Sequence, residues 1–180
     1  MKTWFHGTPH DFETFDPARL GKGNDQLGSG FYFTDREDTA YGYAAGGFVL
    51  VAELAISSPL LPETRFTRRQ IEEMLRASPD FGDLICNWGE VDFEGEGVVV
   101  RRAVDSYAAI NEGCDDALQV LNAISNDLWN GQEAAFLAAV RDLTGHDGLF
   151  RSYGEETHAV VWFPEQVKVI ERRQALSVRP

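Results

Sequence analysis

Short apolar runs gather at the two ends of the chain, and their spacing predicts β-strands there. The run Lys2–His6 is followed by Gly-Thr-Pro, which is typical of a strand that ends in a turn. The run Phe48–Ile56 is rich in β-branched residues and is followed by prolines, which indicates a central strand. The predicted strands are Lys2–His6, Gly30–Thr34, Phe48–Ile56, Leu149–Ser152, His158–Phe163 and Val167–Arg172, with a turn at Pro164-Glu165.

Helical periodicity dominates the middle of the chain. Thr67 is the expected cap of one helix, whose apolar face holds Ile71, Met74 and Leu75. Asp35 is the expected cap of an earlier helix, with Asp38 where a capping box has Glu. The predicted helices run from Asp35 to Ala45, before Gly46-Gly47, and over Arg68–Ala77, Asp115–Leu128 and Glu133–Thr144, before Gly145. Asp11–Asn24 is a predicted loop anchored by Phe12 and Phe15, and Phe81–Gly97 has no assignment.

Strands at both ends with helices between them indicate an α+β fold, in which the terminal strands meet in space. The chain has 180 residues and no repeat or linker. This length fits one domain. We therefore expect residues 1–180 to form a single domain with a helical insertion at about residues 67–144.

The composition is typical of a globular protein, with 43% hydrophobic and 25% charged residues. No apolar run approaches the roughly 20 residues that cross a bilayer, and no secretory signal is visible. The two cysteines, Cys86 and Cys114, are too few for a disulfide framework or a cysteine-based zinc site. These features predict a cytoplasmic protein without a membrane partner.

The net charge of −13 disfavours binding to a phosphate backbone by bulk attraction. Six acidic residues and no Lys or Arg occur from Asp80 to Glu96. Such a stretch indicates a solvated face, and a docking surface for a basic partner is the alternative.

Two glycine-containing motifs near the start carry the candidate chemistry. In the first, Phe5–Thr8 (FHGT), the glycine lets the backbone approach a ligand closely because it has no Cβ. In the second, Gly28–Thr34 (GSGFYFT), alternation puts Tyr32 and Thr34 on one face of a strand. Tyr43 follows in the next helix, and two tyrosines near one site can stack on a planar ring. Together the motifs favour a nucleotide pocket, whereas each residue alone fits an ordinary core or strand-end role.

These motifs resemble the ADP-ribosyltransferase superfamily, in the His-Tyr-Glu branch that includes diphtheria toxin and the poly(ADP-ribose) polymerases. The family pattern is His-Gly-Ser/Thr at a strand end, then Gly-x-Gly-x-Tyr-Phe, then a second Tyr in the next helix. The segments Gly145–Leu149 and Val160–Lys168 look like the tail of small bacterial and phage transferases. The resemblance covers both ends of the chain and implies a split antiparallel sheet with helices.

The resemblance also implies roles for single residues. His6 would hydrogen-bond the adenosine ribose of NAD, and Gly7 would hold the nicotinamide carboxamide through its backbone. The two tyrosines would flank the nicotinamide ring, and Ala40 stands where some members have a serine that bonds the carboxamide. The NAD-binding set is therefore His6, Gly7, Thr8, Tyr32, Phe33 and Tyr43.

The reaction of the family also needs a carboxylate, because the departure of nicotinamide builds positive charge on the ribose. In the family this is a Glu at the start of a late strand, and its position falls on His158 here. Glu156 would share a face with His158 if the strand begins at Glu156. We expect Glu156 to be the carboxylate. Glu155, His158 in a variant role, or no competent carboxylate are the alternatives. The expected catalytic set is His6, Tyr32, Glu156 and His158.

In the family, the loop before this strand helps to choose the acceptor, and here it would be Arg151–Thr157. Enzymes that modify arginine often carry a Glu two residues before the catalytic position. Glu156 fills that place if His158 is the catalytic position, and Gly154 occupies it if Glu156 is. The acceptor therefore stays open, and Tyr153 could stack on it.

The function implied by the resemblance is mono-ADP-ribosyl transfer from NAD to a macromolecule, with release of nicotinamide. A protein acceptor is favoured by the acidic charge, and nucleic acid is the alternative. A toxin or effector domain and a phage-borne modifier are both compatible uses. The alternative function is a binding module for NAD or ADP-ribose. An enzyme that uses NAD as phosphate acceptor on tRNA is disfavoured, because no basic groove is visible. No metal is expected, since Pro9 prevents a helix between His6 and His10.

Overall fold

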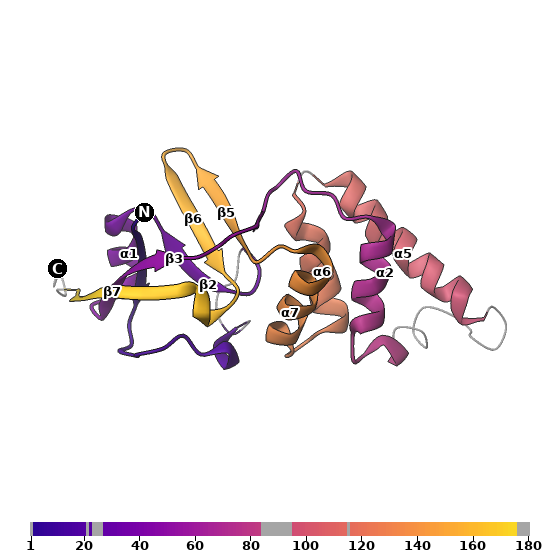
Figure 1. Cartoon of the computed structure of the whole chain (residues 1–180), viewed down its shortest axis with the longest axis horizontal. Helices are drawn as coiled ribbons and strands as arrows, with labels where there is room; N and C mark the ends of the chain where they lie inside the picture. Colours follow the sequence, from indigo (N-terminus) through magenta and orange to yellow (C-terminus); the bar gives the residue numbers. More distant parts are fainter. Residues whose placement is uncertain (1, 21, 23–26, 84–94, 115, 176–180) are drawn as a thin grey trace. The chain divides into compact units, whose positions relative to one another are not determined.

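The computed structural model of the chain describes residues 2–20, 22, 27–83, 95–114 and 116–175. Contacts between Cα atoms divide the chain into two compact units, one of Met1–Pro59 with Asp147–Pro180 and one of Leu60–His146. The expectation of a single domain stays a prediction. The first unit carries most of the sheet and the second is helical (Figure 1).

Within the described residues, the sheet has seven strands in the order β4-β5-β6-β2-β1-β3-β7. Strands from the two ends of the chain pair with each other, β2 with β6 and β3 with β7, and both pairs are antiparallel. The predicted α+β class and the meeting of the terminal strands are therefore confirmed. The strands are β1 (Trp4–Thr8), β2 (Phe31–Thr34), β3 (Phe48–Leu54), β4 (Pro59–Leu60), β5 (Gly148–Tyr153), β6 (Glu156–Val161) and β7 (Val167–Gln174).

The sheet is nearly divided between β1 and β2. These strands are in register at one position, Phe5 opposite Thr34, whereas β1 pairs with β3 at every residue from Trp4 to Thr8. The seven strands thus form two groups, β4-β5-β6-β2 and β1-β3-β7, which meet at a narrow junction. This is the split that the family resemblance implied.

Helix α1 (Glu37–Ala44) packs its backbone against β1. A Cβ on Gly7 would overlap the carbonyl oxygen of Ala40 and lie 2.9 Å from the backbone nitrogen of Ala44. Gly7 is therefore required here by the close approach of a helix and a strand. The helix ends at Ala45, which is in the left-handed region, followed by Gly46, as the sequence predicted.

The predicted cap of α1 is wrong. Its N-cap is Arg36, whose side chain makes no capping hydrogen bond and instead pairs with Asp38. Asp35 cannot serve as the cap because its carboxylate accepts a hydrogen bond from the Thr157 backbone N–H and pairs with Lys2. The acidic residue thus ties β2 to the start of β6.

The second unit contains the predicted helical stretch. In α2, Thr67 and Gln70 form a capping box, and the buried face holds Ile71, Met74 and Leu75 as predicted. Helix α5 carried no prediction, although its buried positions follow helical spacing. The helices described in this unit are α2 (Arg68–Ala77), α5 (Glu96–Gly113), α6 (Leu118–Leu128) and α7 (Glu133–Thr144).

Several strand ends differ from the prediction. β1 continues to Thr8, so His6 lies within a strand and not at its end, and β3 stops at Leu54. β6 begins at Glu156, two residues earlier than predicted. This earlier start places Glu156 and His158 on one face of the strand.

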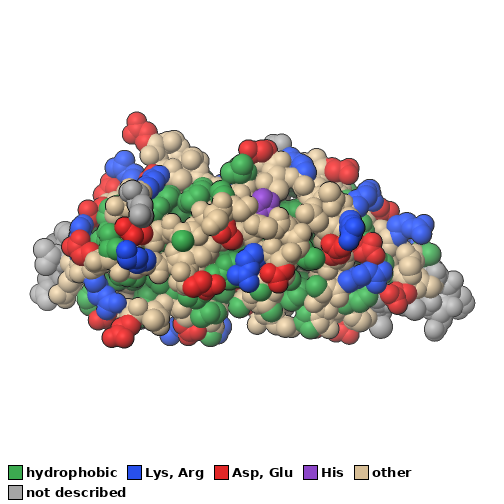
Figure 2. All heavy atoms as spheres, viewed as in Figure 1, with side chains coloured by type: hydrophobic (Ala, Val, Ile, Leu, Met, Phe, Trp, Pro, Cys, Tyr) green, Lys and Arg blue, Asp and Glu red, His purple; other side chains and the backbone are tan. Residues whose placement is uncertain are grey.

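None of the helices within the described ranges is long and apolar enough to span a membrane. On the face shown in Figure 2, acidic and basic side chains of the described residues are interspersed. Most of the acidic segment Asp80–Glu96 falls in 84–94, outside the described residues, so its docking role stays a prediction.

Candidate active site

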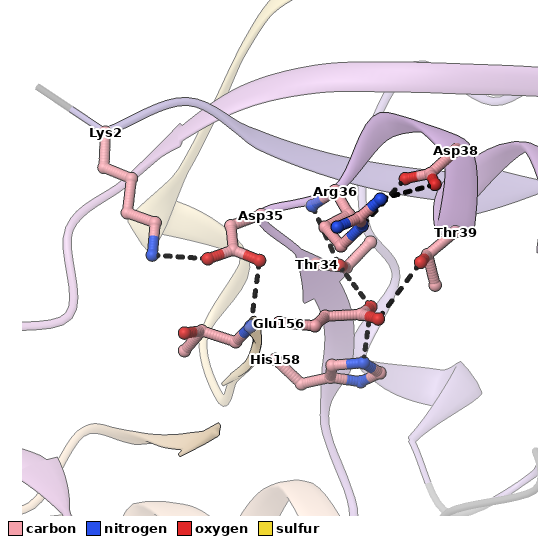
Figure 3. Close-up of polar contacts among 9 residues, drawn as sticks. Lys2, Thr34, Asp35, Arg36, Asp38, Thr39, Glu156 and His158 are labelled. Carbon is pink, nitrogen blue, oxygen red and sulfur yellow. Dashed lines mark hydrogen bonds and ion pairs between the residues drawn. The ribbon is translucent and has the colours of Figure 1, made fainter. Parts of the chain in front are cut away.

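A carboxylate cluster, formed by Thr34, Thr39, Glu156 and His158, lies where β2, α1 and β6 meet (Figure 3). Thr34 stands opposite His158 in the register of β2 and β6, so their side chains share a face of the sheet. Glu156 reaches this group from the first position of β6. Residues more than 110 positions apart thus converge on one carboxyl group.

The Glu156 carboxylate accepts three hydrogen bonds from groups in the described part of the chain. Oε1 accepts from the Thr34 hydroxyl at 2.7 Å and from His158 Nε2 at 2.8 Å. Oε2 accepts from the Thr39 hydroxyl at 3.1 Å. Since a carboxylate offers about four acceptor positions, one remains for a ligand.

Two opposing effects set the pKa of Glu156. Burial raises it, but the hydrogen bonds from Thr34 and Thr39 and the interaction with His158 outweigh this effect, so the pKa is lowered. The side chain is 21% exposed. Glu156 is therefore an ionised carboxylate that is held in place and still reachable.

A tight hairpin sets Glu156 apart from Glu155. Tyr153 pairs with Glu156, so only Gly154 and Glu155 form the turn, and Gly154 has a φ of 64°. Glycine at the first turn position is typical of a two-residue type II′ hairpin. The turn leaves Glu155 exposed. The predicted loop Arg151–Thr157 is therefore wrong, because β5 and β6 continue through most of it.

His6 crosses the junction between β1 and β2. Its Nδ1 lies 2.7 Å from the backbone carbonyl oxygen of Tyr32. Because a carbonyl oxygen only accepts, Nδ1 must carry the proton, and in the neutral ring Nε2 is left as an acceptor. No group among the described residues hydrogen-bonds Nε2. The side chain of His6 thus replaces backbone pairing at the junction and offers one acceptor to a ligand.

The His6 cluster consists of His6 and the rings of Phe12, Phe15 and Phe33, whose centroids lie 6.0, 5.2 and 5.4 Å from the imidazole. Burial lowers the pKa of His6, an effect that the hydrogen bond to Tyr32 only partly offsets. Phe33 is 2% exposed. The ring of Phe33 thus supports His6, and its direct contact with NAD stays a prediction.

The hydroxyl of Tyr32 is fixed by the chain segment just before it. It donates to the Gly28 carbonyl oxygen at 2.5 Å and accepts from the Leu27 N–H at 3.0 Å. The ring is partly exposed, in contrast to the buried neighbours Phe31 and Phe33. The hydroxyl therefore orients the ring, and the ring face is the part that can meet a ligand.

The remaining predicted NAD-binding residues differ in their surroundings. Thr8 is buried, and its hydroxyl bonds the backbone of His10. Tyr43 is 64% exposed, whereas Ala40, three residues earlier in α1, is fully buried. The exposed Tyr43 ring is free of core packing, and its stacking role stays a prediction.

Thr34 and Thr39 were not predicted as site residues. The sequence showed Thr34 on the same strand face as Tyr32, but a threonine in a strand is too common to mark a site. Thr39 lies in the first turns of α1, and only the fold brings it to Glu156. What marks both threonines as site residues is that each donates a hydrogen bond to the Glu156 carboxylate.

Residues 1–175 match the model of a family described as ADP-ribosyltransferase in polyvalent proteins. No curated protein and no solved structure matches the chain. The family match spans both units, including the helical stretch that the resemblance left unassigned.

Proposed function

We propose an enzymatic function for this chain, which belongs to the family of ADP-ribosyltransferases in polyvalent proteins. The chain transfers ADP-ribose from NAD to a macromolecular acceptor and releases nicotinamide. It belongs to the His-Tyr-Glu branch, with Glu156 supplying the carboxylate and His158 standing at the usual glutamate position. The observation that carries this assignment is the Glu156 carboxylate, held by Thr34, Thr39 and His158.

Glu156 acts where charge develops. When the bond between nicotinamide and ribose breaks, the sugar becomes positively charged, as in glycoside cleavage. A fixed carboxylate stabilises that charge without reorganising. The unused acceptor position of Glu156 suits a ribose hydroxyl, which the carboxylate would orient.

His6 and Tyr32 serve binding in this proposal. Neutral His6 offers Nε2 to a ribose hydroxyl, because Nδ1 is engaged by the Tyr32 carbonyl. Tyr32, with its hydroxyl fixed, and the exposed Tyr43 offer ring faces to nicotinamide. Gly7 would hold the nicotinamide carboxamide through its backbone, and Thr8 and Phe33 complete the proposed NAD-binding set.

A protein acceptor is favoured over nucleic acid, because the net charge of −13 opposes contact with a phosphate backbone. The proposal includes action in the cytoplasm, as a toxin or effector domain or as a phage-borne modifier. The alternative function, a module that binds NAD without turnover, is motivated by His158 at the usual glutamate position.

The test is turnover of NAD labelled on the adenosine. Nicotinamide release and label on macromolecules are measured for the wild-type chain, Glu156→Gln and Glu155→Gln. We expect Glu156→Gln to lower nicotinamide release about 10²-fold or more, as for removal of one group that stabilises transition-state charge.

Glu155→Gln is the matched control. It removes the same charge one residue away, from an exposed turn position, and should leave the rate within about twofold. Equal rates for Glu156→Gln and the wild type would refute the assignment of Glu156. Tight binding of NAD without turnover by the wild type would favour the binding module.

A further inference from the structure

We infer that His158 is the general base that removes the proton from a hydroxyl acceptor, and that this hydroxyl belongs to a protein side chain. The inference rests on the proposed transfer of ADP-ribose and adds the chemical class of the acceptor. It is carried by the hydrogen bond from His158 Nε2 to Glu156 and by the position of the other ring nitrogen.

The bond to Glu156 fixes the tautomer of His158. A carboxylate oxygen only accepts, so Nε2 carries the proton, and in the neutral ring Nδ1 holds a lone pair. No group among the described residues hydrogen-bonds this Nδ1, and the side chain is 19% exposed. A carboxylate that holds one ring nitrogen while the other faces a nucleophile is the arrangement that activates hydroxyl groups in enzymes.

Groups from two other strands surround the imidazole. Tyr153 meets it edge-on, with ring centroids 5.3 Å apart, and is itself 56% exposed next to the hairpin turn. Arg151 on β5 and Thr34 on β2 stand opposite His158 in register. The charge of Arg36 also acts on Glu156. The exposed Tyr153 places the approach of an acceptor over the tip of the hairpin.

The bond between the ribose C1′ and the nicotinamide nitrogen breaks, and its electron pair stays on nicotinamide, which leaves neutral. A lone pair of the acceptor oxygen forms the new bond to C1′. The hydroxyl proton passes to Nδ1 of His158, whose imidazolium remains bonded to Glu156 and later releases the proton to water.

A base at position 158 favours acceptors that must lose a proton as the new bond forms, and this property indicates the chemical class of the acceptor. A carboxylate acceptor has no proton to lose, and a guanidinium group holds its protons too strongly for imidazole to take one. A hydroxyl is neutral and must lose its proton as the bond forms, so it gains most from His158. The net charge and the exposed Glu155 at the hairpin turn disfavour a hydroxyl on nucleic acid.

The experiment uses the full chain, adenosine-labelled NAD, and a cell extract separated into a protein fraction and an RNA fraction. Label on protein is treated with neutral hydroxylamine, which cleaves carboxylate esters but not bonds to hydroxyl side chains, and modified residues are mapped by mass spectrometry. We expect label on serine, threonine or tyrosine that survives the treatment. Label on carboxylates, on arginine or on RNA, or release of nicotinamide to water alone, overturns the inference.

Variants of His158 separate a base from a positioning group. In His158→Gln the amide can still donate to Glu156 but cannot accept the proton, so transfer should fall about 10²-fold. The pH profile of transfer should differ between the wild type and His158→Gln, because only the wild type has a proton-accepting nitrogen at this position. Added imidazole should restore part of the activity of His158→Ala. Full activity in His158→Gln with an unchanged pH profile overturns the inference.

The two proposals fail in different ways. If the wild type binds no NAD and releases no nicotinamide, the proposed function fails. If transfer occurs and depends on Glu156 but not on a proton acceptor at position 158, only the role of His158 as a base fails.

Discussion

The carboxylate cluster and the His6 cluster lie in the same unit and on neighbouring strands, yet they are built in opposite ways. In the carboxylate cluster, the side chains of Thr34, Thr39 and His158 all donate hydrogen bonds to Glu156. In the His6 cluster, three phenylalanine rings surround an imidazole that makes one hydrogen bond, to a backbone carbonyl. The carboxylate cluster is thus a charge-fixing region, which holds an ionised carboxylate in place by hydrogen bonds. The His6 cluster is a shape-fixing region, which holds an imidazole in place by the packing of aromatic rings.

The difference follows from the alternation of side chains along the strands. Phe5 shares a face with its partner Thr34, so His6 falls on the opposite face, with Phe33. A ligand that contacts both His6 and Glu156 must therefore lie at the junction of β1 and β2, where backbone pairing is limited to one position. The near-split of the sheet makes two different clusters available to one ligand.

The largest effect on stability that we expect comes from Gly7→Ala. This change should disrupt the carboxylate cluster more than the His6 cluster, because it displaces α1. The new methyl group collides with the backbone of α1, and a helix backbone cannot yield as a flexible side chain does. We expect a loss of about 3 kcal/mol in the free energy of unfolding, measured by urea denaturation. Since α1 carries Thr39, kcat should fall as well.

Gly42→Ala is the matched control, in the same helix. A Cβ at this exposed position meets nothing within 4 Å, so the change should stabilise the helix by about 0.5–1 kcal/mol. If Gly7→Ala were as stable as the wild type, the close packing of α1 on β1 would be refuted.

Much of the fold could be predicted from the sequence, because local patterns set it. The capping box at Thr67, the apolar stripe of α2 and the glycine after α7 act within a few residues. The cap of α1 was mispredicted because Asp35 is engaged by Thr157, which is remote in sequence. Competition from tertiary contacts is not visible in a local pattern.

The residues of the candidate site also divide into those that a local motif predicts and those that only the fold brings to the site. His6 and Tyr32 belong to motifs of fixed spacing, and in the structure the His6 imidazole donates a hydrogen bond to the backbone carbonyl of Tyr32. Thr39 could not be found from the sequence, since it reaches Glu156 only when α1 lies on β1. The fold decided which candidate carboxylate is held, because a two-residue turn exposes Glu155 and anchors Glu156.

A smaller effect should come from His6→Ala, which removes a binding group and leaves the carboxylate in place. Loss of one hydrogen bond to the ribose, worth about 1.4 kcal/mol, should raise the KM for NAD about tenfold while kcat changes less. Nicotinamide release at varied NAD concentration measures both constants. His10→Ala is the control, because the His10 side chain is exposed and makes no hydrogen bond in the described part of the chain. A drop confined to kcat in His6→Ala would assign His6 to the chemical step.

The smallest effect should separate the two clusters by pH. Burial lowers the pKa of His6 below 6.5, so the unfolded chain binds this proton first, and stability falls as the pH drops through 6.5 towards the folded pKa. The pKa of Glu156 is lowered below 4.5, because its hydrogen bonds outweigh the opposing effect of burial. The stability that Glu156 contributes is therefore present above pH 4.5 and is lost as the pH falls through the folded pKa.

Urea unfolding between about pH 8 and about pH 3.5 tests both windows. His6→Ala should reduce the loss of stability in the upper window, and Glu156→Gln should reduce it in the lower one. If each substitution altered both windows equally, the two clusters would be one coupled network, and the division between a charge-fixing and a shape-fixing region would not hold.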